Sequence, residues 1–147
     1  MKLLPVLALV LALVGCGSET GEPSEPMQPG QLEHVLEQAE DGNFTLYVSN
    51  QSFERQKVHI KVWIDAFVAV DDDFEVGNQH NWIDFTFDLD DGKHTLRAES
   101  VAGEAALEET FQVEGRRWAV VDYWCCDSGQ AEPKFTFMVS EEPIAFA

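Results

Sequence analysis

The fold is decided by the stretch Val58-His59-Ile60-Lys61-Val62-Trp63-Ile64, in which every second residue is a β-branched apolar one. A strand turns successive side chains to opposite faces of its sheet, so a period of two predicts a strand with one buried face. Valine and isoleucine also favour the extended backbone of a strand. We therefore expect this stretch to be a central strand of an all-β domain.

Similar alternation or short apolar runs recur on both sides of this stretch, at short and regular spacing. They predict further strands at residues 44–49, 66–70, 83–89, 94–98, 107–113, 118–124 and 135–139. About eight strands at such spacing indicate a β-sandwich or a barrel. Residues 31–41 differ, because Leu32, Val35, Leu36 and Ala39 follow a helical period and predict a short helix before Gly42.

Two turns are expected between the later strands. Asp90-Asp91-Gly92-Lys93 is typical of a tight hairpin, because glycine can adopt the positive φ that such a turn requires. Val101-Ala102-Gly103-Glu104 is expected to be the next turn.

The segment from Gly92 through His94-Thr95-Leu96 to Gly103 resembles a recurrent hairpin of bacterial Ig-like and fibronectin-III-like domains. In those families a turn glycine is followed by His-Thr-Leu or Tyr-Thr-Leu and then by a second glycine turn. The resemblance implies an Ig-like antiparallel β-sandwich of about eight strands in a secreted protein, often an adhesive or spacer module. The Cys…Trp…Cys spacing of antibody domains is absent, so only the architecture is expected.

The chain opens in the layout of a secretory signal, with Lys2, an apolar run from Leu3 to Val14, and a small residue before Cys16. Leu13-Val14-Gly15-Cys16 resembles the lipobox of bacterial lipoproteins at every position. The resemblance implies that residues 1–15 are removed as a signal peptide and that Cys16 carries lipid, including an amide-linked acyl chain such as palmitate. An ordinary signal peptide is the alternative, but its A-x-A-like cleavage site is missing.

The expected organisation is a signal peptide at 1–15, a lipidated Cys16 with a flexible acidic tether to residue 31, and an Ig-like β-sandwich domain at 32–147. The tether is rich in Gly, Ser, Glu and Pro, which cannot pack a core. The expected location is the bacterial cell envelope. Gly17 follows Cys16, and since Asp at that position retains enteric lipoproteins at the inner membrane, we expect the outer membrane or cell surface if the source has an outer membrane.

The charge of the chain excludes several classes of partner. Its 147 residues carry a formal charge of −18, with 27 Asp and Glu against 9 Lys and Arg. Such a charge repels nucleic acid and anionic lipid headgroups. No nucleophile elbow, phosphate loop, zinc-protease or dinucleotide motif is present. We expect no catalytic residues, no cofactor and no enzymatic activity, but a binding or interaction module whose partner is an envelope protein or a glycan.

The adjacent Cys125 and Cys126 leave three interpretations open: a vicinal disulfide, a soft-metal site completed by His80, and two small residues without a joint role. Neighbours on a regular strand point to opposite faces, so a joint role requires a turn, which Asp127-Ser128-Gly129 makes plausible. An oxidising compartment favours the disulfide over free thiols, whereas ring strain opposes it. His80 lies in an expected loop, where functional residues are common.

Trp63, Trp82 and Trp124 are the candidate ligand platform. Trp63 and Trp82 fall opposite the apolar stripes of their strands, and Trp124 lies in an aromatic-rich strand with Trp118 and Tyr123. Exposed aromatic rings can stack on sugars or dock a partner. The alternative is that both sheet faces are covered and that these residues belong to the core.

Overall fold

The structure, a computed structural model, describes residues 33–77, 81–126 and 132–146. These residues form nine β-strands in two facing sheets and contain no helix. The predicted all-β sandwich is therefore confirmed. The signal peptide, Cys16, the tether and His80 lie outside the described residues.

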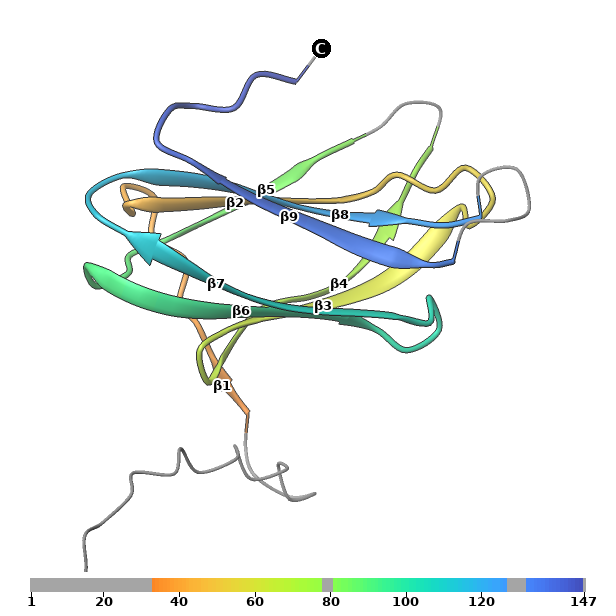
Figure 1. The fold of residues 1–147 in the computed structure, drawn as a ribbon, viewed down its shortest axis with the longest axis horizontal. Coiled ribbons are helices and arrows are strands. Elements are labelled where there is room, and N and C mark those ends of the chain that lie inside the picture. Colours follow the sequence, from red (N-terminus) through yellow and green to blue (C-terminus); the bar gives the residue numbers. More distant parts are fainter. Residues whose placement is uncertain (1–32, 78–80, 127–131, 147) are drawn as a thin grey trace, which may run out of the picture. The chain divides into compact units, whose positions relative to one another are not determined.

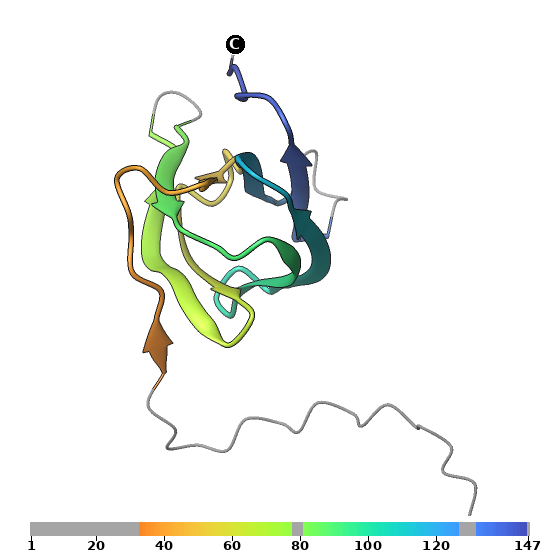
Figure 2. The ribbon, with the colours of Figure 1, turned by 90° about the vertical axis from the view of Figure 1, so that its left-hand side faces the viewer.

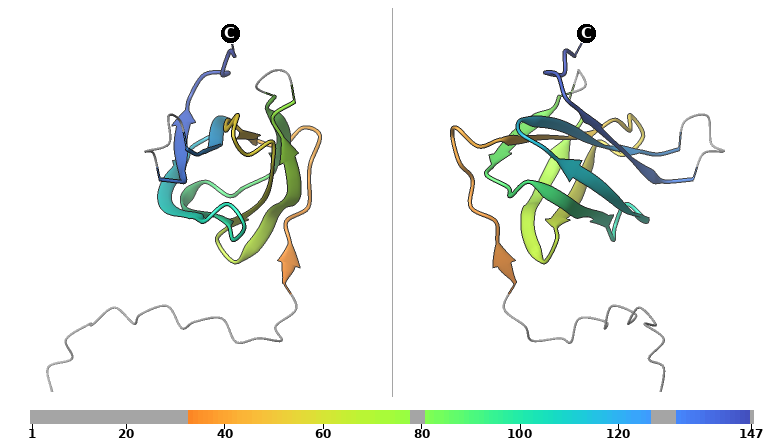
Figure 3. Two further views of the ribbon diagram at one scale, coloured as in Figure 1. Left: turned by 90° about the vertical axis from the view of Figure 1, so that its right-hand side faces the viewer. Right: turned by 60° about the vertical axis from the view of Figure 1, so that its left-hand side comes forward.

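The strands are β1 (His34–Val35), β2 (Phe44–Asn50), β3 (Lys57–Ile64), β4 (Phe67–Glu75), β5 (Ile83–Phe87), β6 (Gly92–Ser100), β7 (Ala105–Val113), β8 (Arg117–Trp124) and β9 (Lys134–Ser140). Sheet A has the order β1-β4-β3-β6-β7, and sheet B has the order β5-β2-β8-β9. Figure 1 shows sheet B as the upper layer and sheet A as the lower one. Figures 2 and 3 show the two layers from the side, with β1 at the margin of sheet A.

The inner faces of both sheets form one hydrophobic core. The decisive stretch contributes Val58, Ile60, Val62 and Ile64 from β3, all of which are buried. Opposite them lie buried residues of sheet B, which are Phe44, Leu46, Val48, Phe87, Ala119, Val121, Tyr123 and Phe135. The period of two therefore predicted the buried face of β3 correctly.

The sheets are mixed rather than purely antiparallel. β2 pairs in parallel with β8 along its whole length, from Phe44 opposite Arg117 to Asn50 opposite Tyr123. β1 also pairs in parallel with β4. The expected antiparallel order fails at these two pairs, because parallel neighbours need long crossover connections that alternation along one strand does not reveal.

The predicted helix over residues 31–41 is wrong. Residues 33–41 instead contain β1 and an isolated bridge between Gln38 and Phe87. The backbone N–H of Leu36 donates to Val68 in sheet A at 2.8 Å, and that of Ala39 donates to Thr86 in sheet B at 2.9 Å. This segment therefore joins one sheet edge to the other, and these tertiary bonds outweigh its local helical spacing.

The predicted hairpin at Asp90–Lys93 is also wrong, because β5 belongs to sheet B and β6 to sheet A. Gly92 instead begins β6 and pairs with Val113. The segment between β5 and β6 therefore crosses from sheet B to sheet A, and Asn43 fixes its start. The Asn43 side chain donates to the carbonyl of Leu89 at 2.8 Å and accepts from the N–H of Leu89 at 2.9 Å.

The turn at Val101–Glu104 does connect a hairpin, between β6 and β7, as predicted. The N–H of Glu104 donates to the carbonyl of Val101 at 3.2 Å. The strand expected at 66–70 is longer than predicted, since β4 continues through Asp71, Asp72 and Asp73 to Glu75.

Candidate functional site

The three candidate tryptophans lie on two different faces of the sandwich. Trp82 and Trp124 lie on the outer face of sheet B, where their indole N–H groups bond outward-facing residues of β8 and β9. Trp63 projects from the outer face of sheet A and is only 8 % exposed. The structure therefore brings together two of the three residues of the predicted platform and separates the third.

Sheet B carries an aromatic face, which we define as Tyr47, Trp82, Trp118 and Trp124. All four side chains are half-buried. Their strand neighbours Leu46, Val48, Ala119, Val121 and Tyr123 point into the core, and the alternation of β2 and β8 therefore turns Tyr47, Trp118 and Trp124 outward. Sequence reasoning did not include Tyr47 or Trp118 in the platform, although the same alternation could have found both.

Phe146, near the C-terminus, lies over part of the aromatic face. Its ring stacks on Trp82 with 4.1 Å between ring centroids and an interplanar angle of 18°. It meets Tyr47 edge to face at 5.0 Å. Figure 1 shows this last segment running above sheet B. One side of Trp82 is therefore already occupied within the chain.

Polar groups lie between these rings and fix two of them. The indole N–H of Trp82 donates to the Asp122 carboxylate at 2.9 Å, and the Ser49 hydroxyl donates to the same carboxylate oxygen at 2.6 Å. The indole N–H of Trp124 donates to the Thr136 hydroxyl at 3.2 Å. Aromatic surface with fixed hydrogen-bonding groups beside it is suited to binding a partner or a ligand.

The outer face of sheet A has a hollow of about 520 Å³ beside Trp63. It is lined by His59, Lys61, Trp63, Arg97, Glu99, Val101 and Ala102. The guanidinium carbon of Arg97 lies 3.8 Å from the centroid of the Trp63 ring, and the Lys61 ammonium lies 5.1 Å from it. β3 and β6 place Trp63 and Arg97 directly opposite each other. Sequence reasoning missed Arg97, because this pairing joins two strands that are not neighbours in the sequence.

Acidic residues of β4 neutralise two of the basic groups on this face. Lys61 forms an ion pair with Asp71 at 3.1 Å, and the two ring nitrogens of His59 contact Asp71 at 2.8 Å and Asp73 at 3.0 Å. The hydrogen bond to Asp73 raises the pKa of His59, burial partly opposes this effect, and the bond to Asp71 adds to it. The aspartate run is therefore part of a charge network across two strands.

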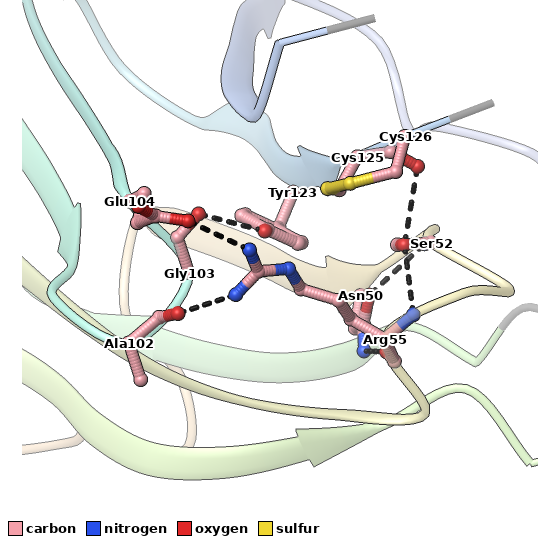
Figure 4. The surroundings of a disulfide bond; sticks show 9 residues. All are labelled: Asn50, Ser52, Arg55, Ala102, Gly103, Glu104, Tyr123, Cys125 and Cys126. Atoms are coloured by element: carbon pink, nitrogen blue, oxygen red, sulfur yellow. Dashed lines mark hydrogen bonds and ion pairs between the residues drawn. A yellow bond between two sulfur atoms is a disulfide. The ribbon is translucent and has the colours of Figure 1, made fainter. Parts of the chain in front are cut away.

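Cys125 and Cys126 are joined by a vicinal disulfide directly after β8 (Figure 4). Cys125 is buried and belongs to the core, whereas Cys126 is half-buried and has a φ of 66°, so the chain leaves strand geometry there. The Ser52 hydroxyl donates to the Cys125 carbonyl at 3.2 Å. Bonded sulfurs offer no thiolate to a metal. Within residues 33–77, 81–126 and 132–146, no three His, Cys, Asp or Glu are grouped to hold a metal ion.

The surroundings of the disulfide tie three segments together at one end of the sandwich (Figure 4). Arg55, in the β2–β3 loop, pairs with Glu104 at 2.8 Å and donates to the Ala102 carbonyl in the β6–β7 turn. The Tyr123 hydroxyl donates to the Gly103 carbonyl of the same turn. This end of the sandwich is therefore held by hydrogen bonds and an ion pair. Among the residues drawn in Figure 4, no nucleophile lies beside a general base.

Comparison with protein-family models, curated proteins and solved structures finds no match for this chain. In the described part of the chain, no helix is long and apolar enough to cross a membrane.

Proposed function

We propose that this protein is a lipid-anchored lipoprotein of the bacterial cell envelope, and that its β-sandwich is a non-catalytic binding module. The lipobox-like sequence ending at Cys16 supports the anchor. The aromatic face supports binding. The anchor and tether hold the domain at the membrane, and the outer face of sheet B contacts the partner.

The observation that carries this proposal is the aromatic face itself. The outer face of a solvated sheet is usually polar, so that apolar and polar residues alternate cleanly along each strand. Sheet B instead turns Tyr47, Trp118 and Trp124 outward, and Met138 on β9 beside them is 53 % exposed. Aromatic residues and methionine are enriched in protein interfaces, and the rigid rings of Tyr and Trp supply large contact areas there at low entropic cost.

A glycan is the second candidate partner, and one observation favours it. The carboxylate of Asp122 accepts from the indole N–H of Trp82, and the hydroxyl of Thr136 accepts from that of Trp124, so each ring has an oxygen beside it. Sugars combine apolar ring faces with hydroxyl groups, so stacking surface beside hydrogen-bond acceptors matches their chemistry. Trp63 is not part of this candidate site, because it belongs to sheet A. The metal-binding alternative at Cys125 and Cys126 gains no support from the bonded sulfurs.

Photo-crosslinking in cells tests the proposal. The crosslinking amino acid p-benzoylphenylalanine replaces Met138 beside the aromatic face in one strain and Phe67 on sheet A in another. Phe67 is a matched control, because its side chain is similarly exposed at 44 %. We expect a discrete adduct from position 138 only, and we expect Trp118→Ala and Trp124→Ala to abolish it.

Digestion of that adduct with protease or glycosidase identifies the class of partner. Equal adducts from both positions, or an adduct from position 138 that persists in both tryptophan variants, would contradict binding through the aromatic face. Thermal unfolding of each variant confirms that the sandwich is intact.

A further inference from the structure

We propose that the hollow beside Trp63 is a second binding site, which takes a small organic monocarboxylate. The carboxylate pairs with the guanidinium of Arg97, and the organic part of the ligand lies against Trp63, Val101 and Ala102. This site is on sheet A and does not depend on the function proposed for the aromatic face of sheet B.

Arg97 is arranged as a carboxylate receptor. Its guanidinium carbon lies 3.8 Å from the centroid of the Trp63 ring, so the flat face of the guanidinium packs against the indole. The N–H donors of a guanidinium lie at its edge and match the two oxygens of a carboxylate. Arg97 forms neither an ion pair nor a hydrogen bond with any residue that the structure describes. The stack therefore fixes the orientation of the guanidinium, while its N–H donors remain available to a ligand.

Trp63 supplies an independent indication of a ligand. Its side chain lines the hollow and is only 8 % exposed. Its indole nitrogen is the one buried side-chain polar atom without a hydrogen-bond partner in the described part of the chain. Buried donors are almost always paired in folded proteins, so an unpaired indole N–H in a residue that lines the hollow is consistent with an acceptor that a ligand supplies.

The charged residues around the hollow favour a ligand with a single negative charge. Lys61 is paired with Glu33 and Asp71, and His59 is paired with Asp71 and Asp73. Arg97 is thus the one unpaired cation in the lining, and the carboxylate of Glu99 lies in the same lining. One unpaired cation balances a carboxylate, whereas the second charge of a phosphate would meet Glu99.

The size and composition of the hollow favour an organic ligand over a free ion. About 520 Å³ falls within the range of small-molecule sites, which is roughly 300–1,000 Å³. Trp63, Val101 and Ala102, together with the alkyl stems of Lys61 and Arg97, provide apolar contact for a ring or chain.

The test uses benzoate and its neutral isostere benzamide, added to the ¹⁵N-labelled full chain in detergent micelles. NMR follows the indole N–H signals of the four tryptophans and the Nε–H signal of Arg97; Trp63→Phe assigns the Trp63 signal. We expect benzoate to shift the signals of Trp63 and Arg97 saturably, and we expect at least tenfold weaker effects from benzamide and phenylphosphonate. The signals of Trp82, Trp118 and Trp124 should not follow the same titration curve.

Substitutions of Arg97 make the test specific. Arg97→Met should weaken benzoate binding at least tenfold. Arg97→Lys keeps the positive charge but lacks the planar guanidinium with its paired donors, and it should also weaken benzoate binding. This second variant provides the test if Arg97→Met does not fold. Arg116→Met is the matched control, because Arg116 is exposed in the β7–β8 connection, outside the hollow. The proposal is overturned if benzoate does not shift Trp63, if benzamide binds equally well, or if Arg97→Lys binds as the wild type does.

Discussion

The hydroxyl of Tyr123 donates a hydrogen bond of 2.8 Å to the carbonyl oxygen of Gly103, inside one end of the sandwich. Tyr123 is fully buried on β8 of sheet B, and Gly103 lies in the β6–β7 turn of sheet A. This bond therefore links the two sheets. A Cβ atom at position 103 would lie 2.9 Å from the Tyr123 ring and 2.5 Å from the Ser100 hydroxyl, which explains the glycine there.

Tyr123→Phe should lower the free energy of unfolding by about 1–3 kcal/mol, because the Gly103 carbonyl would be left buried without its donor. Urea denaturation of the full chain measures the loss. Tyr47→Phe is the control, since Tyr47 is half-buried on the aromatic face. A loss that is no larger at position 123 than at position 47 would show that the buried bond contributes nothing to stability.

His59 should make the domain less stable as the pH rises. Its pKa is raised in the folded state by the bonds to Asp73 and Asp71, against the effect of burial. A raised pKa stabilises the fold fully below the unfolded value of about 6.5, and this contribution is lost as the pH rises through the folded value. His59 is more than half exposed, so we expect a loss under about 0.5 kcal/mol between pH 6 and 9.

Urea denaturation across this pH range measures the effect of His59. His59→Gln should reduce the decline in stability, and His34→Gln should leave it unchanged, because His34 is exposed on β1 and has no ion pair among the described residues. Part of the decline in stability should persist in both variants, because the pKa of His94 is also raised in the folded state. Burial alone would lower its pKa, but the bonds to Asp65 and to the Asp90 carbonyl raise it.

The disulfide between Cys125 and Cys126 predicts that a thiol reagent labels neither residue until a reductant is added. The bond closes a loop of only two residues, so its reduction should change the free energy of unfolding little. Mass spectrometry of labelled, denatured full chain counts the labels at these two positions. Complete labelling without reductant would mean free thiols or a labile metal site, and added zinc or copper, followed by a chelator, would separate those cases.

The lipobox-like sequence predicts that Cys16→Ser prevents acylation and releases the protein from the membrane or stalls its export. Mass spectrometry of the N-terminal peptide from the membrane fraction identifies the acyl groups. Gly17→Ala, which keeps the cysteine, should still be lipidated. Acyl groups that persist on the Cys16→Ser protein, or an unmodified N-terminus elsewhere in the wild-type protein, would exclude this anchor.

Apolar patterning along the chain was enough to predict that β2, β3, β8 and β9 are strands, and alternation also predicted the face that β3 buries. It was not enough to predict which strands pair. The residues before Phe44 show helical spacing, but bonds from Leu36 and Ala39 to the two sheets hold them extended. Gly92 is typical of a hairpin, but its strand crosses to the other sheet. Both errors have the same physical origin, since partners distant in the sequence override a local preference.

The candidate sites show the same contrast between what one strand determines and what the pairing of distant strands determines. The outward position of Trp124 could be predicted from β8 alone, because it alternates with the buried Val121 and Tyr123. Trp82 precedes β5, and Ile83 of its expected buried stripe is instead 46 % exposed, so alternation did not determine its position. The stack of Arg97 on Trp63 could not be predicted, since it requires β3 to pair with β6 in one particular register. The disulfide was one of the interpretations of the adjacent cysteines, and the buried position of Cys125 beside Ser52 could not be inferred from their spacing.

The parallel pairing of β2 with β8 also determines when the domain can fold. Ser49 on β2 bonds Asp122 on β8, which is 73 residues later in the chain. β2 is a central strand of sheet B, so this sheet cannot be completed until nearly the whole domain is available. Folds that depend on such distant pairings form slowly, on the order of milliseconds to seconds. The chain therefore cannot complete its sandwich before β8 and β9 have been synthesised. Such a delay suits the export proposed above, because an incompletely folded chain can be threaded through a narrow channel.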